Sequence, residues 1–397
     1  MNILILANKA LNPPDGGSLA ILSLAKGYSK MGHHVFLLNM ITHKHTNDND
    51  FAGSEYKNSL KILGVNVNTK TSLIAILTNL LFSNKPYIAQ RFISKAYQKK
   101  LIELLNTESF DVLQVEGLYM LQYLKTIQNY FSGKIVYRPH NIEHEIWKRN
   151  SDETKSLIKK IYFRILAHRL KNLEISFLNK YDYIIPISPK DSDYYTTLGN
   201  KKPSLTAPFG LDFKKIQPDK LNKNYRNIIF IGALDWIPNQ KGLIWFIQNC
   251  WESVIKADHN IQLLIAGRNA PGWLKKIIQK KHRIQFLGEI ENAHHFISNN
   301  GPLIVPLFAG SGIRVKIIEA MALKKCIIST SIGAEGIPYA NGKNIIIADT
   351  CDDFIKAIIR VSNDQAYQDK MGENAFQLAV KHFDHEEIAK DVLNFIT

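Results

Sequence analysis

Residues 302–330 read PLIVPLFAGSGIRVKIIEAMALKKCIIST and carry the pattern from which the fold class is predicted. An apolar run over 302–307 is followed by a glycine-rich turn, a series of good helix formers and a second apolar run over 326–330. Apolar strands that alternate with helices are typical of βαβ units, whose parallel sheets are covered by helices on both faces. The stretch therefore predicts one βαβ unit of a parallel sheet.

The same alternation extends along the chain in both directions. Roughly five strands, a break and five more predict an α/β protein rather than one closed barrel. We expect two doubly wound, Rossmann-like domains that face each other across a cleft. The expected strands lie at 2–7, 34–39, 112–117, 134–139, 182–188, 227–233, 261–267, 283–288, 302–307 and 326–330.

The break between the two series of strands lies near residues 208–227, where Pro, Gly, Asn and charged residues replace the apolar period. A chain of 397 residues has room for two domains of ordinary size. We expect an N-terminal domain over 1–212, a linker over 213–226 and a C-terminal domain over 227–383. A last helix over 384–397 is a candidate to pack back on the first domain.

Composition and local sequence indicate the cellular compartment of the protein. Three cysteines in apolar or helical contexts indicate buried thiols of a reducing compartment. The first apolar run begins at the first residue with no basic segment before it, which favours a strand over a signal peptide. No uncharged apolar stretch is long enough to span a bilayer. We therefore expect a cytoplasmic protein.

The loop after the run at 302–307 is the strongest candidate site. Gly310 and Gly312 bracket Ser311, and a helix is expected to begin near Arg314, with Lys316 in its first turn. Free backbone N–H groups and the helix dipole attract phosphate at such a place, and the two cations add to that attraction. Farther along the helix, a carboxylate at position 319 can accept a hydrogen bond from a sugar hydroxyl. The alternative is an ordinary helix start with a solvated face.

The run from Gly310 to Thr330, followed by GAEGI at 333–337, resembles the donor-binding segment of retaining GT-B glycosyltransferases of family 4. Many members carry two glutamates eight positions apart. Glu319 matches the second, whereas Ser311 occupies the place of the first. Arg314 and Lys316 are similar to the basic residues of one subgroup. The resemblance spans nearly the whole chain.

The resemblance implies a GT-B enzyme that moves a sugar from a nucleotide diphosphate sugar to a hydroxyl acceptor, with retention at the anomeric carbon. The acceptor would be a glycan, a lipid-linked saccharide or another glycoconjugate. The first domain would lie on the acceptor side and the second would bind the donor. Ile313 would belong to the donor loop together with Gly310, Ser311 and Gly312.

A second glycine-rich loop follows the first expected strand, where Gly16 and Gly17 open a helix. It is not a G-x-G-x-x-G sequence, and no acidic residue ends the next strand, so a dinucleotide site is poorly supported. In the resembling family, a loop at this place lies against the donor phosphates and the acceptor. The alternative is a turn without a ligand.

Residues 138–145, RPHNIEHE, follow the expected strand at 134–139 and formally match the zinc motif H-x-x-E-H. That motif needs both histidines on one continuous helix, whereas Pro139 and the strand place His140 in a loop. The family carries a histidine near the donor sugar at this position, which His140 matches. Asn141, Glu143 and His144 either line the acceptor side or only begin the following helix.

The loop FIGALDWIPNQKG at 230–242 offers further donor contacts. The family supplies an arginine and a lysine to the donor phosphates here. Lys241 fits the lysine. The arginine has no counterpart in this chain, where Asp235-Trp236 occupies that stretch. Arg268, at the end of the strand 261–267, is a candidate replacement, or else a surface arginine.

No residue in the matched motifs is placed as a carboxylate nucleophile. Catalysis would rest on positioning and on stabilising the leaving diphosphate, with His140, Arg314 and Lys316 as the catalytic residues. We expect no metal and no cofactor, because protein cations would do the work of a metal. Two alternatives stay open: a non-catalytic GT-B partner subunit, favoured by Ser311, and a sugar-nucleotide epimerase.

The net charge of +15, from 50 Lys and Arg against 35 Asp and Glu, attracts polyanions. Segments 147–171 and 73–92 combine apolar side chains with cations and are candidates for peripheral contact with an anionic membrane, on the inner face of the cytoplasmic membrane. The alternative is a pair of amphipathic helices that pack on the first domain. No nucleic-acid-binding motif is present, so nucleic acid is not an expected partner.

Overall fold

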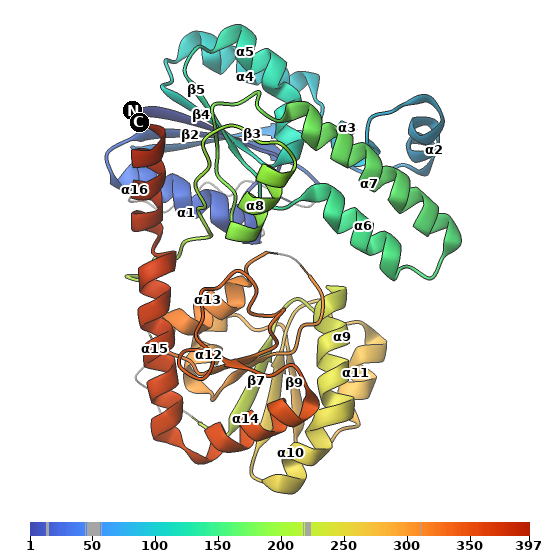
Figure 1. Ribbon diagram of the computed structural model, residues 1–397, viewed down its shortest axis with the longest axis vertical. Helices are drawn as coiled ribbons and strands as arrows, with labels where there is room; N and C mark the ends of the chain where they lie inside the picture. The colour runs from blue at the N-terminus through green and yellow to red at the C-terminus, as the bar shows by residue number, and fades with distance from the viewer. Residues whose placement is uncertain are drawn as a thin grey trace. The chain divides into compact units, whose positions relative to one another are not determined.

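The computed structural model describes residues 1–12, 16–43, 45, 56, 58–216, 218, 224–310 and 312–397. The chain forms two compact units (Figure 1). The first comprises Met1–Gly210 with His385–Thr397, and the second comprises Leu211–Asp384. The linker expected over 213–226 therefore counts with the second unit, and part of it lies outside the described residues.

The first unit is built on a six-stranded parallel sheet in the order β3-β2-β1-β4-β5-β6. Its central strand β1 is buried from Ile3 to Ala7, as expected for a parallel sheet covered on both faces. The strands are β1 (Asn2–Ala7), β2 (His34–Ile41), β3 (Leu60–Asn66), β4 (Val112–Glu116), β5 (Lys134–Arg138) and β6 (Tyr183–Ile184). The helices are α1 (Gly16–Lys30), α2 (Leu73–Phe82), α3 (Tyr87–Gln90), α4 (Lys95–Thr107), η2 (Leu118–Tyr123), α5 (Leu124–Tyr130), α6 (Glu143–Glu153), α7 (Leu157–Phe177), α8 (Pro189–Thr197) and α16 (His385–Ile396).

The second unit repeats this winding in a second parallel sheet, β12-β11-β10-β7-β8-β9. Read from β9, its strands follow the same order as those of the first sheet. The strands are β7 (Asn227–Ile231), β8 (Gln262–Ala266), β9 (Ile284–Gly288), β10 (Leu303–Val305), β11 (Ile327–Ser329) and β12 (Ile346–Ile347). The helices are α9 (Ile237–Trp245), η3 (Phe246–Cys250), α10 (Trp251–Ala257), α11 (Gly272–Gln279), α12 (Ala293–Asn299), α13 (Val315–Ala322), α14 (Cys351–Asn363) and α15 (Gln365–Phe383).

These sheets confirm the predicted α/β class with two doubly wound, Rossmann-like units. Each sheet has one strand more than the sequence predicts, and both additional strands lie at a sheet edge. Strand β3 exposes Lys61, Gly64 and Asn66, so its sequence lacks a continuous apolar run. Strand β12 is only two residues long.

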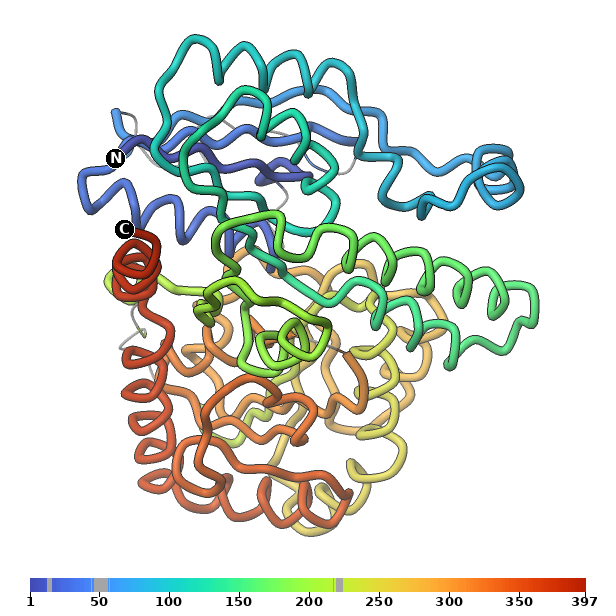
Figure 2. Tube along the Cα trace, turned by 45° about the horizontal axis from the view of Figure 1, so that its top comes forward, coloured from blue at the N-terminus to red at the C-terminus, as the bar shows by residue number. Residues whose placement is uncertain are grey.

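The C-terminal helix α16 belongs to the first unit, where it lies beside α1 in both views (Figures 1 and 2). The backbones approach closely at Gly27, where an added methyl group would lie 2.4 Å from the Ala389 Cβ. Lys30 and Glu386 join the same two helices by an ion pair of 2.6 Å. The end of the chain therefore completes the helical layer over the first sheet.

The strand order indicates where ligands bind. In doubly wound sheets, ligands bind outside the carboxyl ends of the strands, at the point where the order reverses. This point lies between β1 and β4 in the first unit and between β7 and β10 in the second. Gly16 and Gly17, the first residues of α1, follow β1 in the chain, and the loop before Arg314 follows β10.

The described helices include none that combines the length and the apolar character needed to cross a membrane.

Candidate functional site

In the second unit, the loop after β10 depends on glycine. Gly310 and Gly312 have φ angles of 121° and 78°, which L side chains rarely adopt. A methyl group at Gly310 would also lie 2.8 Å from Arg314 Nη2 and 3.1 Å from the Trp236 ring. The loop therefore packs against the arginine that follows it. Ser311 lies outside the described residues.

Arg314 is the N-cap residue of α13, and its side chain crosses to the loop after β7. Its guanidinium carbon lies 5.6 Å from the centroid of the Trp236 ring, within the range of a cation–π contact. Arg314 itself is 7% exposed, whereas Trp236 is 38% exposed. A largely buried cation thus stands beside an accessible aromatic ring at the start of a helix.

Lys316 lies two residues farther along and points to the end of β7. Its Nζ donates to the carbonyl of Ile231 and to Oδ1 of Asn239, both at 3.1 Å, and lies 4.7 Å from the Phe230 ring centroid. Burial, and secondly the charge of Arg314, lower the pKa of Lys316 to about 7. An ammonium group has three donors, and acceptors among the described residues take two of them.

Asn239 is a positioning residue that the sequence analysis did not single out. It is buried at the start of α9, and its Nδ2 donates to the Ala233 carbonyl at 2.9 Å while its Oδ1 accepts from Lys316. A side chain at Gly232 would collide with this amide, since an added methyl group would lie 2.8 Å from Asn239 Nδ2. The signal in the sequence was the final Asn of DWIPN, at 235–239.

Glu319 has a partner that was also missed. The Nε2 atom of His294, in α12, lies 3.7 Å from Glu319 Oε1, and both side chains are partly exposed. The carboxylate therefore keeps acceptor capacity for a hydroxyl group. Ile313, next to the loop glycines, is partly exposed.

Lys241 and Arg268 lie at the same edge of the second sheet. Lys241 is exposed on α9, the helix that follows β7, and Arg268 lies two residues after the end of β8. The Arg268 carbonyl accepts from the Leu234 N–H at 2.9 Å, so this loop is tied to the one after β7. Both residues remain predicted donor contacts.

In the first unit, the centre of the candidate site is a carboxylate that sequence reasoning missed. Glu116 ends β4, is fully buried, and accepts from Arg138 Nη1 at 3.3 Å, from the His140 Nε2 and from the Gln114 amide. Burial raises the pKa of Glu116, but the Arg138 charge and the hydrogen bonds from His140 and Gln114 outweigh it, and the pKa falls below its usual value. An acid that ends an apolar strand, VLQVE, was the available signal.

Glu116 orients His140. The Glu116 carboxylate accepts from the ring nitrogen that faces it, Nε2, so Nε2 carries a proton and Nδ1 is the ring nitrogen turned away from Glu116. This nitrogen faces the start of α1: a methyl group at Gly17 would lie 3.4 Å from His140 Nδ1 and 2.6 Å from Lys9 Nζ. The structure thus brings Gly17 and His140 together and adds Lys9. Gly16 and Asn141 adjoin this pair in the chain.

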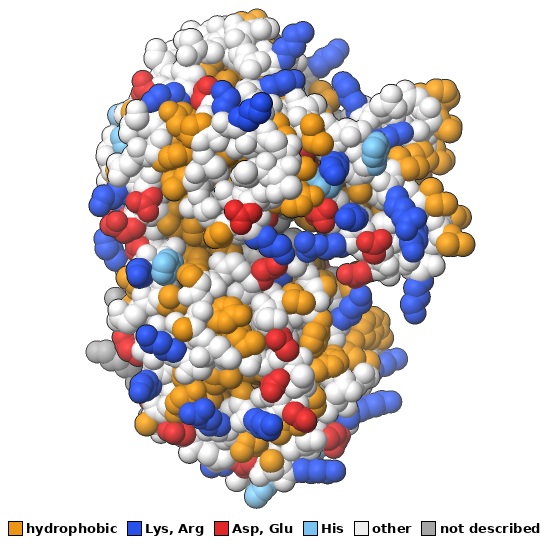
Figure 3. Space-filling view, viewed as in Figure 1, with side chains coloured by type: hydrophobic (Ala, Val, Ile, Leu, Met, Phe, Trp, Pro, Cys, Tyr) orange, Lys and Arg blue, Asp and Glu red, His pale blue; other side chains and the backbone are white. Residues whose placement is uncertain are grey.

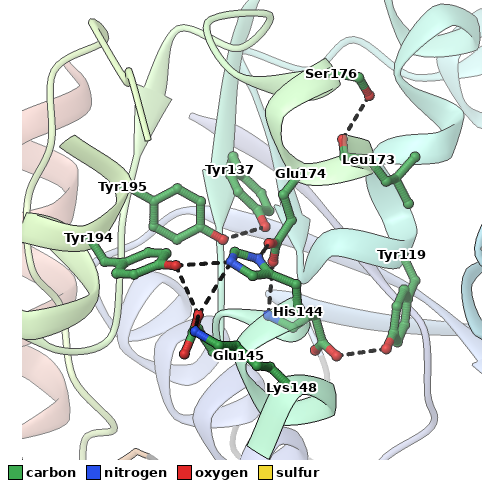
Figure 4. A network of polar contacts seen from close by, with 11 residues as sticks. Tyr119, Tyr137, His144, Glu145, Lys148, Leu173, Glu174, Ser176, Tyr194 and Tyr195 are labelled. Atoms are coloured by element: carbon green, nitrogen blue, oxygen red, sulfur yellow. Dashed lines mark hydrogen bonds and ion pairs between the residues drawn. The ribbon is translucent and has the colours of Figure 1, made fainter. Parts of the chain in front are cut away.

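His144 fits the second of its two interpretations, since it lies in the first turn of α6. It is 3% exposed, its Nδ1 bonds the buried carboxylate of Glu174, and its Nε2 bonds the Tyr194 hydroxyl at 3.0 Å (Figure 4). Tyr194 also donates to Glu145 at 3.1 Å. The ring therefore ties α6 to α7 and α8, and it does not line an open acceptor site.

Glu143 begins α6, as one of the two interpretations allowed. Its Oε2 accepts from the Tyr119 hydroxyl at 2.6 Å, its N–H donates to Glu174 at 2.8 Å, and burial raises its pKa to about 7. It is partly exposed and stays a predicted acceptor-side residue.

The H-x-x-E-H match does not describe a shared site. His140 and His144 bond different carboxylates, those of Glu116 and Glu174. Among the residues that the structure describes, no group of three or more His, Cys, Asp or Glu side chains is arranged to hold a metal ion.

The sequence of this chain is similar to those of known proteins. Residues 225–364, which include the loop after β10 and α13, match the family described as Glycosyl transferases group 1. A Klebsiella pneumoniae relative, an uncharacterized 44.6 kDa protein in the cps region, is 26% identical over 387 residues, covering 95% of each chain.

Solved structures resemble the whole chain. Alr3699/HepE from Anabaena, in complex with UDP, has a TM-score of 0.68 at 13% identity and covers 99% of each chain. It has also been solved with UDP-glucose. Sucrose-phosphate synthase from Thermosynechococcus elongatus has a TM-score of 0.68 at 17% identity and covers 99% of this chain and 98% of its own. At such identities the likeness shows the fold.

The chain thus has the two-domain GT-B fold of glycosyltransferases, and its residues 225–364 match the Glycosyl transferases group 1 family.

Proposed function

We propose that this protein is a glycosyltransferase that moves a sugar from a nucleotide diphosphate sugar to a hydroxyl acceptor. The observation that carries the proposal is the pair Arg314 and Lys316 at the start of α13, where the second sheet reverses its strand order and within the matched family segment. Two cations beside free helix N–H groups suit a diphosphate. The UDP and UDP-glucose bound by the Anabaena protein support a nucleotide sugar as donor.

We propose that transfer proceeds with retention and without a metal. The acceptor oxygen forms a bond to the anomeric carbon while the bond from that carbon to the diphosphate oxygen breaks. The departing phosphate oxygen takes the acceptor proton on the same face of the sugar. Arg314 and Lys316 stabilise the negative charge that develops on the leaving diphosphate, which is the work a metal ion would otherwise do.

The first unit contributes orientation on the acceptor side. With Nε2–H held by Glu116, His140 Nδ1 can accept a hydrogen bond from a sugar hydroxyl. Gly17 leaves the space in which that nitrogen and Lys9 lie close to the backbone of α1. The ring acts as a positioned acceptor, and Glu116 acts through it.

The test is a screen of UDP-sugars and GDP-sugars with pooled sugar acceptors. We expect release of a nucleoside diphosphate that depends on an acceptor, and a product whose anomeric configuration, measured by proton NMR, equals that of the donor. Release, from donor alone, of a sugar with inverted configuration at a ring carbon would indicate an epimerase. Nucleotide binding by calorimetry without turnover of any donor would indicate a non-catalytic subunit.

We also propose that the first unit contacts an anionic membrane through an exposed apolar surface, which we call the α2–α7 surface. Its eight apolar side chains are 59–85% exposed. Arg169 of α7 donates to the Asn79 and Leu80 carbonyls and so holds α2 beside α7. The surface consists of Leu73, Ile74, Leu77, Leu81, Phe82, Leu157, Ile158 and Ile161.

Charge favours lipid as the occupant of the α2–α7 surface. Lys85, Lys155, Lys159 and Arg164 are exposed on the same segments. In Figure 3, which has the view of Figure 1, apolar side chains gather at the right, in the region of α2 and α7, with Lys and Arg side chains beside them. Apolar side chains flanked by cations are typical of helices that lie in the interface of anionic membranes.

The membrane proposal predicts that Phe82→Glu with Ile158→Glu reduces binding to vesicles containing phosphatidylglycerol at least tenfold. Each substitution removes about 1.5–3 kcal/mol of apolar burial and adds repulsion from the lipid headgroups. Co-sedimentation measures the effect, and Trp273→Glu, an exposed aromatic residue of the second unit, is the control. Unchanged sedimentation of the double variant would contradict the proposal.

A further inference from the structure

A pocket of about 240 Å³ lies in the first unit, and the proposed transfer reaction does not account for it. Its lining residues follow β1, β2 and β3 in the chain, and residues at the end of α3 form a further wall. These three strands are neighbours in the sheet, so the pocket lies at their carboxyl ends, where doubly wound sheets bind ligands. Its lining includes Lys9, Thr42, His43, His45, Thr71 and Arg91.

The chemistry of the lining favours an anion. Lys9 and Arg91 are cations, His43 and His45 add two imidazole rings, and none of the described residues that line the pocket is Asp or Glu. Threonine hydroxyl groups add neutral donors. A concave site with several cationic donors and no carboxylate raises the local concentration of negatively charged ligands.

Arg91 is the lining residue whose contacts indicate most directly that the pocket binds an anion. Its guanidinium carbon lies 5.7 Å from the Phe92 ring centroid, and Phe92 is itself stacked on Tyr119 at 5.0 Å. The Phe92 ring packs against the guanidinium, whose Nε is buried and has no hydrogen-bond partner among the residues that the structure describes. A buried donor without a partner costs free energy, and an oxyanion in the pocket would satisfy it in the paired geometry that arginine prefers.

The pocket adjoins the acceptor side of the proposed reaction. Lys9 lines it, and Lys9 Nζ also lies close to Gly17, which faces His140 Nδ1. A ligand held by Arg91 and Lys9 would therefore extend toward the ring that is proposed to orient a sugar hydroxyl.

We propose that this pocket binds an oxyanion carried by the acceptor, a phosphate or carboxylate on the saccharide whose hydroxyl receives the sugar. The inference rests on the proposed function and deepens it, because it names the chemical class of the acceptor. Acidic acceptors are selected by Arg91, Lys9 and His43, and neutral saccharides are not.

Three probes with one sugar ring test the inference: methyl α-D-glucopyranoside, its 6-carboxylate (the methyl glucuronoside) and its 6-phosphate. Each is titrated by calorimetry into the full chain, with and without the nucleoside diphosphate that the donor screen identifies. We expect at least one acidic probe to bind tenfold or more tightly than the neutral one. The tighter of the two acidic probes identifies carboxylate or phosphate as the natural group.

Three variants test whether the acidic probe binds in this pocket. Arg91→Gln is expected to weaken the acidic probe at least tenfold, and His43→Gln, at an exposed position, several-fold. Lys95→Gln removes a cation four residues away, on α4 and outside the lining, and is expected to change binding less than twofold. Thermal melting checks that each variant is folded.

Any of three results would overturn the inference. They are equal affinity for neutral and acidic probes, an Arg91→Gln variant that binds like the wild type, and a loss of binding in Lys95→Gln equal to that in Arg91→Gln. The donor titration separates this result from failure of the proposed function. A protein that binds and turns over a nucleotide sugar but ignores probe charge loses only this inference. A protein that binds no nucleotide loses the proposed function, while the probe titration still reports on the pocket.

Discussion

The double variant Arg314→Ala with Lys316→Ala is expected to transfer sugar about 10²- to 10⁴-fold more slowly than the wild type, measured as kcat/KM. A hydrogen bond to a charged group contributes about 1.5–3 kcal/mol, so two such contacts to the leaving diphosphate contribute about 3–6 kcal/mol. Both side chains come from the same turn of α13, and Arg314 is largely buried there, so water replaces them poorly.

A matched pair of lysines controls for net charge. Lys256→Ala with Lys280→Ala removes two exposed cations from the same unit, at the ends of α10 and α11, and should change kcat/KM less than twofold. Comparison of kcat with the dissociation constant for the nucleoside diphosphate separates binding from catalysis. Transfer by the Arg314 and Lys316 variant at the control's rate would remove both residues from the mechanism.

The sequence predicted the parts of the fold that are marked by local pattern. Buried central strands such as β1 and β7 have continuous apolar runs, since helices cover both faces of each sheet. The edge strands β3 and β12 escaped prediction because one is partly polar and the other is very short. Their pairing depends on neighbours far away in the chain.

The site was predictable where one loop carries it and not where distant segments meet. The run from Gly310 to Lys316 has its chemistry within one turn and one helix start. The partners of its residues come from elsewhere: Asn239 holds Lys316 across 77 positions, and Glu116 holds His140 across 24. For His144 the sequence left two interpretations open, because the residue that decides between them, Glu174, lies 30 positions away in the chain.

The affinity of the wild type for its nucleoside diphosphate is expected to fall roughly 15-fold between pH 7.0 and 8.5. Burial and the Arg314 charge lower the pKa of Lys316 to about 7 in the free protein, and a bound diphosphate would raise it toward its usual value. Between the two pKa values, binding takes up a proton, so affinity falls as pH rises above 7. The second phosphate pKa is about 6, so the ligand keeps its charge throughout this range.

Two variants assign this pH dependence to Lys316. Lys316→Arg stays protonated and should bind with a nearly flat profile, while Lys316→Met should bind weakly at every pH and be equally flat. Calorimetry at pH 8 in buffers of different ionisation enthalpy counts the protons directly: about one taken up by the wild type and none by Lys316→Met. A steep profile that persists in Lys316→Met would place the titrating group elsewhere. A flat wild-type profile would mean that the diphosphate does not contact the Lys316 ammonium, which Ile231 and Asn239 would then hold for structural reasons alone.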